Sequence, residues 1–365
     1  MHHAIAAFAT LLIGWNLAPS PAQACERPLT LNATGNLKLE GMLTIPCGLE
    51  NDDVTHAVVL VHGSGPSDMD GNVTAVTRDQ KKNLLLKGIS SALMKEGFAV
   101  IRYHKRSYQW QRLIQKDPKL ATSAKLKDFQ ANAYKHLLAD VESAVQWAQT
   151  NLKNAQVTLL GHSQGTFLAL QAAHTNKTIK GVALLGFYAT GLGTLAYSQI
   201  VHRTIEQLKT FDTNSNGRWT AAELKQGPPG LAALAGLVPS FDHDGDKALS
   251  VSEIQSFLVQ PLLVPPLADL SKQEAPYPSV TSILRTATFK TAFFHGTWDN
   301  QTPVFQTYAM EKILKSIKGT SRTHFRYFPR LGHGLDPREN PLDVLYQLSD
   351  PAALKTLAKD LKAFL

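Results

Sequence analysis

The sequence is poor in cysteine, in charge and in long apolar runs, and each scarcity excludes a class of protein. Only 2 of its 365 residues are cysteine, which excludes a scaffold built on many disulfides. Charged residues make up 18% and hydrophobic residues 44%, a balance that supports a large buried core rather than disorder. Lys and Arg outnumber Asp and Glu by 37 to 29, a net charge of +8, but no nucleic-acid-binding motif accompanies this excess. We therefore expect a globular protein with no nucleic-acid partner.

The N-terminal residues have the pattern of an export signal. Residues 4–14 (AIAAFATLLIG) form an apolar run that is too short to cross a bilayer. Small residues at Ala22 and Ala24 suit cleavage before Cys25. The pattern predicts a signal peptide over residues 1–24 and a periplasmic or secreted protein, with an ordinary N-terminal helix as the alternative. No other run is long and apolar enough to predict a transmembrane span.

Both cysteines lie in the mature chain and flank a predicted hairpin. Residues 29–45 alternate apolar and polar side chains, with Gly35 near the turn. In an exported protein Cys25 and Cys47 could therefore form a disulfide. The alternative is that Cys25 carries a lipid, which we rank lower because a lipoprotein signal usually has a Leu-like residue where Ala22 stands.

Apolar strands and amphipathic helices alternate along most of the chain. Strands are predicted at 57–61, 98–103, 157–160, 182–185, 291–294 and 325–328, and helices at 84–93, 131–148, 354–365 and from 167 onward. This alternation predicts an α/β fold with a mostly parallel sheet covered on both faces. The rhythm stops between residues 191 and 279, where Pro and Gly cluster, and then resumes. We therefore predict a core of residues 25–190 and 280–365 with an inserted helical cap at 191–279.

A candidate nucleophile lies between a strand and a helix. The sequence Gly161-His162-Ser163-Gln164-Gly165 follows the strand residues VTLL and precedes the apolar helix residues TFLALQAA. A turn this tight holds its central residue in a strained conformation and presents the hydroxyl at the carboxyl end of the sheet. The pattern predicts Ser163 as a catalytic nucleophile, with His162 pointing away from the pocket.

A serine nucleophile needs a base and a carboxylate that orients the base, in the chain order Ser, acid, His. Asp299 follows the predicted strand at 291–294, and His333 lies in a glycine-flanked loop after the next strand. We therefore predict a triad of Ser163, Asp299 and His333. His295 competes for the role of base, but its place at the end of a strand favours a structural role.

The oxyanion-binding amides are predicted from the first strand-to-helix loop and from the residue after the nucleophile. The loop reads His62-Gly63-Ser64-Gly65-Pro66, and its glycines allow a close approach of the backbone. We expect the amides of Ser64 and Gln164 to be the donors, with Gly65 as the alternative to Ser64.

These residues resemble the α/β-hydrolase family. Residues 62–71 (HGSGPSDMDG) are similar to bacterial serine esterases that are related to dienelactone hydrolases and prolyl-oligopeptidase-type domains. The resemblance covers about residues 29–190 and 280–365. The subgroup usually has Asp-Lys-Arg-Gly after the second parallel strand, whereas here His104 and Ser107 replace the acid and the glycine. The basic segment that begins there, residues 105–127, could favour an anionic substrate, but we expect it to be a solvated loop and helix face.

The insertion contains two segments with the spacing of calcium-binding EF-hand loops. The first spans residues 212–223, with Gly217 at the sharp turn, and the second spans residues 242–253, with Lys247 in place of that glycine. Trp219 and Leu249 are predicted to meet across the two loops. The predicted ligands are Asp212, Asn214, Asn216, the carbonyl of Arg218 and Glu223 in the first loop, and Asp242, Asp244, Asp246, the carbonyl of Ala248 and Glu253 in the second. We expect one or two Ca²⁺ ions and no organic cofactor.

Together these patterns predict an exported serine hydrolase that cleaves a small-molecule carboxylic ester through an acyl-enzyme, with a Ca²⁺-stabilised cap that shapes its pocket. Two alternatives remain open at this point. One is a peptidase or amidase of the same fold, because the triad alone does not distinguish an ester from an amide. The other is a non-catalytic calcium-binding interaction protein on a hydrolase scaffold. The sequence leaves the oligomeric state open.

Overall fold

The structure is a computed structural model that describes residues 23–73, 81–318 and 321–365. The predicted signal peptide thus lies outside the described residues except for its last two positions. Within the described ranges, no helix combines the length and the apolarity needed to cross a membrane.

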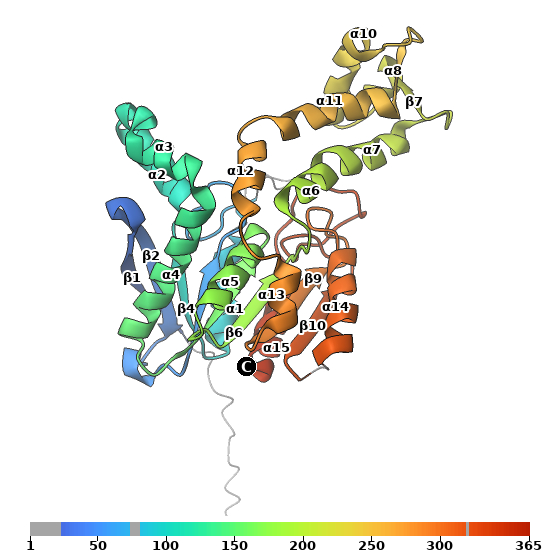
Figure 1. The fold of residues 1–365 in the computed structure, drawn as a ribbon. Coiled ribbons are helices and arrows are strands. Elements are labelled where there is room, and N and C mark those ends of the chain that lie inside the picture. The colour runs from blue at the N-terminus through green and yellow to red at the C-terminus, as the bar shows by residue number, and fades with distance from the viewer. Residues whose placement is uncertain (1–22, 74–80, 319–320) are drawn as a thin grey trace, which may run out of the picture.

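An eight-stranded, mostly parallel sheet forms the centre of the molecule (Figure 1), as the alternation of strands and helices predicts. Its order is β1-β2-β4-β3-β5-β6-β9-β10. The six strands from β4 to β10 in this order are parallel, and the hairpin β1–β2 joins antiparallel to β4. The bounds are β1 (Ala24–Ala33), β2 (Leu37–Pro46), β3 (His56–Val61), β4 (Ala99–Tyr103), β5 (Gln156–His162), β6 (Gly181–Leu185), β9 (Lys290–Gly296) and β10 (Thr323–Phe328).

Helices cover both faces of the sheet because successive strand residues point to opposite sides. On β3, Val58 and Leu60 pack into one apolar core while Val59 and Val61 pack into the other. The first core is closed by α1 (Leu85–Lys95) and α15 (Pro351–Phe364). The second is closed by α4 (Ala133–Asn151), α5 (Gln164–Thr175), α13 (Val280–Thr286) and α14 (Phe305–Lys318), with α2 (Arg106–Lys116) and α3 (Ala124–Ala131) beside α4.

Between β6 and β9 the chain leaves the sheet and forms a projecting helical unit (Figure 1). α6 and α7 lead away from the core, and α11 and α12 return beside them; we call these four helices the stalk. At its far end a small module has its own apolar core, which includes Leu208, Trp219 and Leu249. The bounds are α6 (Leu192–Tyr197), α7 (Arg203–Leu208), β7 (Arg218–Thr220), α8 (Ala221–Leu224), α9 (Pro229–Ala232), α10 (Val238–Phe241), β8 (Ala248–Ser250), α11 (Val251–Leu263) and α12 (Leu267–Glu274).

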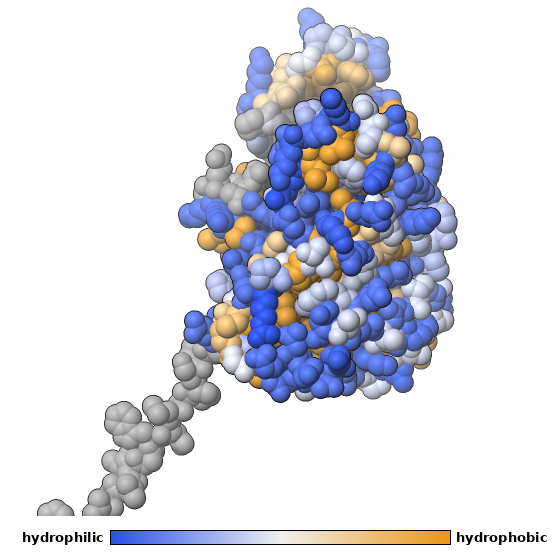
Figure 2. Space-filling model, turned by 90° about the vertical axis from the view of Figure 1, so that its left-hand side faces the viewer, coloured by the Kyte–Doolittle hydropathy of each residue, from blue (hydrophilic) through white to orange (hydrophobic). Residues whose placement is uncertain are grey.

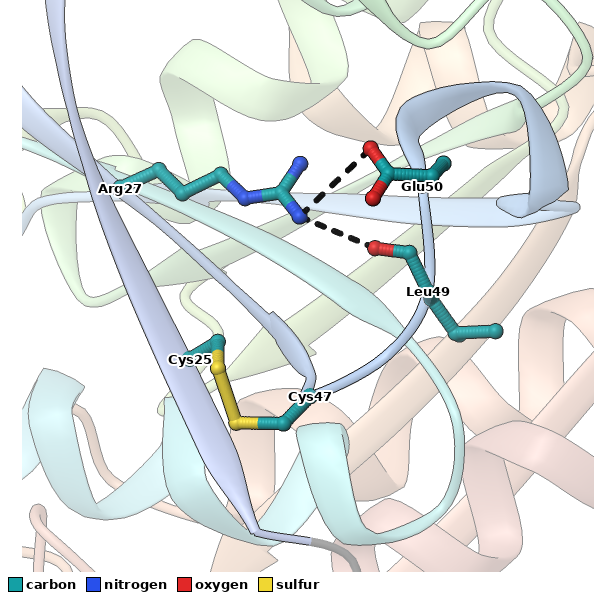
Figure 3. Close-up of a disulfide and its surroundings, with 5 residues drawn as sticks. All are labelled: Cys25, Arg27, Cys47, Leu49 and Glu50. Carbon is teal, nitrogen blue, oxygen red and sulfur yellow. Dashed lines mark hydrogen bonds and ion pairs between the residues drawn. A yellow bond between two sulfur atoms is a disulfide. The ribbon is translucent and has the colours of Figure 1, made fainter.

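The β1–β2 hairpin is tied to the segment that follows it (Figure 3). Cys25 and Cys47 form a disulfide, which confirms the predicted pairing. Nearby, Arg27 donates a hydrogen bond to the carbonyl of Leu49 over 3.0 Å and pairs with Glu50 at 3.9 Å.

On the face turned to the viewer in Figure 2, hydrophilic side chains predominate and apolar groups form small separate areas.

Candidate active site

Ser163 occupies a strained turn between β5 and α5. Its φ of 55° lies in the left-handed region, which is unusual for a residue with a side chain. The turn is so tight that a Cβ on Gly161 would lie 2.2 Å from the carbonyl oxygen of Gly165. A Cβ on Gly165 would lie 2.2 Å from the carbonyl oxygen of Val61. Gly161 is therefore required by the turn itself, and Gly165 by the packing of the turn against β3.

The structure brings Asp299 and His333 into direct contact. Asp299 Oδ2 lies 2.7 Å from His333 Nδ1, so the carboxylate accepts the Nδ1 proton and leaves Nε2 free to act as a base. Thr302 holds the carboxylate in place through its amide at 2.9 Å and its hydroxyl at 2.7 Å. The amide of Gln301 donates to the same carboxylate over 2.8 Å.

Asp299 stays ionised although it is buried. Burial on its own would raise its pKa, but the electrostatic interaction with His333 and the hydrogen bonds from His295 and His333 hold the pKa well below its usual range. His295 lies at the end of β9, where its Nδ1 is 2.8 Å from Thr307 Oγ1 and its Nε2 is 2.7 Å from the carbonyl oxygen of Thr302. These contacts fix His295 as a structural residue, as its position in the sequence suggested.

Ser163 and His333 line one small cavity of about 110 Å³ together with Ser64, His62 and Tyr346. No hydrogen bond joins Ser163 to His333 among the described residues, which is common for catalytic groups before a substrate binds. The imidazole fits closely against β6, because a Cβ on Gly186 would lie 2.8 Å from His333 Cε1.

The expectation for His162 is wrong. Its side chain does not point away from the pocket but lines the same cavity, and its ring centre lies 4.5 Å from that of His333. His162 Nε2 donates to the carbonyl oxygen of His333 over 3.1 Å. Burial lowers the pKa of His162 to about 3, so the ring is neutral and braces the loop that carries His333. The sequence could not show this contact because the two residues are 171 positions apart.

The two residues whose amides are the predicted oxyanion donors, Ser64 and Gln164, both line the larger pocket. In the described parts of the chain, the amides of Ser64 and Gln164 donate to no protein acceptor. Ser64 borders both the small cavity and a larger pocket of about 650 Å³. Gly65 has a φ of 78°, so the loop turns sharply just after Ser64.

The loop after β4 holds the Ser64 loop at several points, and both departures from the family pattern take part. His104 Nδ1 accepts a hydrogen bond from the amide of Met69 over 2.9 Å, a role that a carboxylate could fill. Ser107 Oγ donates to the carbonyl of Gly65 over 3.3 Å, which a glycine could not do. Lys105 donates to the carbonyl of Gly63 over 2.6 Å.

The basic segment that begins at Lys105 does not start as a solvated face. Lys105 and Arg106 are buried, and Arg106 pairs with the buried carboxylate of Asp140. Sequence reasoning missed Lys105, and the signal that could have found it is its position at the carboxyl end of a central strand.

The stalk, rather than the far module, forms one wall of the larger pocket. The lining of this pocket combines Ser64, Lys105 and Gln164 from the core with apolar residues of the stalk and of the helices beside the stalk. Among the apolar members are Phe129, Leu192, Ala196, Ile200, Pro266 and Leu270. No residue of the two predicted calcium loops belongs to this lining.

The two predicted calcium loops lie side by side in the far module. β7 and β8 pair antiparallel with Trp219 opposite Leu249, which confirms that these two residues meet. Lys247 takes a left-handed conformation with a φ of 66°, close to the 72° of Gly217 at the matching position of the first loop. A side chain at this position therefore does not prevent the turn.

The donor set of the second loop fits a hard cation. Carboxylate oxygens of Asp242, Asp244 and Asp246 lie within 4.8 Å of one another. Glu253 accepts hydrogen bonds from Ser250, which lower its pKa to about 2 and keep it ionised. The side chain of Arg218 pairs with Asp244 at 2.8 Å and with Asp246, a contact between the loops that the sequence did not reveal.

In the first loop, the carboxylate of Asp212 caps the turn by accepting from the amides of Asn216 at 3.1 Å and Gly217 at 2.8 Å. Glu223, at the end of the loop, reaches back to Thr213 Oγ1 at 2.8 Å. Both carboxylates thus accept hydrogen bonds from within their own loop.

Comparisons with known proteins identify the family of this chain. A family model described as "Alpha/beta hydrolase family" matches residues 58–348. The chain is 32% identical over 161 residues to "Esterase EstD" of Thermotoga maritima, a match that covers 44% of this chain and 32% of the relative. The chain thus spans about a third of the length of this curated relative.

Solved structures match this chain at low sequence identity. An acylaminoacyl peptidase in complex with Z-Gly-Gly-Phe-chloromethyl ketone superposes with a TM-score of 0.52 and 11% identity, over 93% of this chain and 41% of that one. The esterase domain of a Rhodothermus marinus protein gives a TM-score of 0.48 and 12% identity over 93% of this chain and 97% of that one. At such identities the first likeness shows the fold alone.

Proposed function

The chain belongs to the alpha/beta hydrolase family, and we propose that it is an exported serine hydrolase that cleaves small-molecule carboxylic esters through an acyl-enzyme intermediate. The observation that carries the proposal is the contact of 2.7 Å between Asp299 and His333 beside a cavity that both His333 and Ser163 line. The 32% identity to an esterase favours ester chemistry.

In the proposed reaction, His333 Nε2 takes the Ser163 proton as Oγ attacks the ester carbonyl carbon. The carbonyl oxygen becomes an oxyanion between the amides of Ser64 and Gln164. When the tetrahedral intermediate collapses, the bond to the alcohol breaks and His333 returns the proton to the leaving alcohol. Water then attacks the acyl-enzyme by the same steps and releases the acid. Asp299 holds His333 in the tautomer that this sequence requires.

The larger pocket supports a substrate with a sizeable apolar group. Its volume of about 650 Å³ lies within the range of small-molecule sites, and its apolar wall comes from the stalk and from helices of the core. Because Ser64 borders both cavities, a substrate can extend from the nucleophile into this pocket.

We propose that Ca²⁺ stabilises the far module and, through it, the stalk. A bound ion would be held by the oxygen donors of the two loops and would offset the repulsion among their carboxylates. The module connects to the catalytic acid through the stalk, since Trp219 Nε1 donates to the carbonyl of Leu208 over 2.8 Å. Gln207 Nε2, on the same helix, donates to the carbonyl of Leu342 over 2.8 Å. Gln199 Nε2 donates to the carbonyl of Gln301 over 2.6 Å, two residues from Asp299.

Export remains a proposal that the described residues support indirectly. The disulfide engages the thiol of Cys25, which leaves no free thiol there for a lipid. A stable disulfide is also typical of an oxidising compartment. Detection of the mature N-terminus in a periplasmic or extracellular fraction, by sequencing of the purified protein, tests this part.

The activity is tested by hydrolysis of p-nitrophenyl butyrate by the wild type, by Ser163→Ala and by the exposed control Ser316→Ala. We expect hydrolysis by the wild type and by Ser316→Ala, and none by Ser163→Ala. A matched anilide, butyryl p-nitroanilide, separates an esterase from an amidase because the acyl group is the same. A folded wild type that cleaves neither compound and does not react with a fluorophosphonate probe would instead favour a binding scaffold.

A further inference from the structure

The amine of Lys105 contacts an acceptor next to each of the two amides that are expected to bind the oxyanion. Its side chain is buried, with the residue 4% exposed, and Nζ lies 2.6 Å from the carbonyl oxygen of Gly63. Nζ also lies 2.9 Å from Oε1 of Gln164. One acceptor thus belongs to the peptide that carries the Ser64 amide, and the other belongs to the residue whose own amide is the second donor.

The bond to Gly63 fixes the direction of the Ser64 amide. In a trans peptide the C=O of one residue and the N–H of the next point in opposite directions. An amine held on the oxygen of Gly63 therefore keeps the N–H of Ser64 pointing away from Lys105. The same bond polarises the peptide unit and makes its N–H a stronger donor.

The peptide needs such an anchor because its neighbours restrain it weakly. Its first residue, Gly63, has no side chain to limit rotation of the backbone, and a second glycine, Gly65, follows directly after Ser64. Gly63 also packs tightly against the nucleophile, since a Cβ there would lie 3.1 Å from Ser163 Cβ. A small rotation of this peptide would therefore change the donor geometry next to the reacting oxygen.

Lys105 is not explained as a member of an ion pair. Asp140, whose charge acts on Lys105, is bound by Arg106, with Arg106 Nε 2.9 Å from Asp140 Oδ2. Burial lowers the pKa of Lys105 to about 7. Both the charged and the neutral amine carry at least two N–H groups, enough for the two acceptors.

We propose that Lys105 is a positioning residue that sets the oxyanion hole by anchoring the Gly63–Ser64 peptide and the side chain of Gln164. This role rests on the proposed function, since it concerns the same site. Lys105 acts on the transition state through the two amides and does not itself contact the oxyanion.

The test compares Lys105→Met with the exposed control Lys119→Met. Two inhibitors separate binding of the transition state from binding of the ground state. Ser163 Oγ adds to the carbonyl carbon of an alkyl trifluoromethyl ketone, which places an oxyanion between the amides. The corresponding methyl ketone binds without forming an oxyanion. We expect Lys105→Met to lower kcat for p-nitrophenyl butyrate by about 10- to 100-fold with little change in KM. The trifluoromethyl ketone should bind more weakly by the same factor, and the methyl ketone should bind as before.

The role is refuted if Lys105→Met keeps kcat within about twofold of the wild type, or if both ketones lose the same affinity. If Lys105→Met does not fold, Lys105→Gln provides the same test, because its side chain is polar but one bond shorter. A wild type that neither hydrolyses the ester nor binds the trifluoromethyl ketone overturns the proposed function as well. An active wild type with an unimpaired Lys105→Met overturns only the role of Lys105.

Discussion

Gly186 offers a direct test of how closely the fold holds His333. It follows β6 with a φ of 63°, and a Cβ there would lie 2.8 Å from His333 Cε1 and 2.9 Å from Nδ1. Contacts this short do not occur for real side chains, so Gly186→Ala must displace the imidazole. That displacement would disturb the contact of 2.7 Å between His333 Nδ1 and Asp299 Oδ2.

The size of the effect follows from two separate costs. A left-handed alanine costs about 1 kcal/mol of stability wherever it is placed. A catalytic group displaced by up to about 1 Å lowers the rate by up to about 100-fold. We therefore expect Gly186→Ala to lower kcat by about 10- to 100-fold while the protein stays folded.

Gly35 provides the matched control for this substitution. It has a φ of 74° in the turn between β1 and β2, and a Cβ there would meet nothing within 4 Å. Gly35→Ala should thus carry the same backbone cost and keep full activity. Urea unfolding measures the stability of both variants, and hydrolysis of p-nitrophenyl butyrate measures their kcat. If the two variants have equal kcat, the argument that Gly186 makes room for His333 is wrong.

Three further predictions concern the metal, the buried amine and the disulfide. Calorimetric titration with Ca²⁺ should show binding with a Kd of about 10⁻⁴–10⁻³ M. Glu253→Gln should weaken this binding, and the exposed control Glu142→Gln should not. No heat of binding in the wild type would contradict the calcium proposal. Burial lowers the pKa of Lys105 to about 7 in the folded protein. Between a pH of about 7 and a pH of about 10, Lys105 is therefore protonated in the unfolded chain but not in the folded one. The free energy of unfolding should rise with pH across this range, because the unfolded state binds one more proton. Urea unfolding should show a smaller rise for Lys105→Met, and an unchanged rise would refute the shift. The disulfide joins cysteines 22 residues apart, so its reduction should lower the free energy of unfolding by about 3 kcal/mol in the same assay. At low temperature the reduced protein should stay folded and keep its kcat. A loss of kcat in folded, reduced protein would contradict this prediction.

The sequence by itself determined the local elements of this protein. The alternation of apolar strands and amphipathic helices predicted a mostly parallel sheet, because strand and helix periods are properties of short segments. The turn around Ser163 was equally readable, since its two glycines are needed by the backbone of the turn and by the strand beside it. Trp219 and Leu249 could be matched because they occupy the same position in two repeated loops.

Only the tertiary structure decided what lies behind and beside these elements. His162 braces the His333 loop from 171 residues away, and Lys105 anchors a peptide 42 residues earlier in the chain. Such contacts depend on which loops the parallel strands bring to one edge of the sheet, and no local pattern of residue types encodes that. A buried lysine and a solvated one look the same in a sequence, because burial is set by the neighbours that folding supplies.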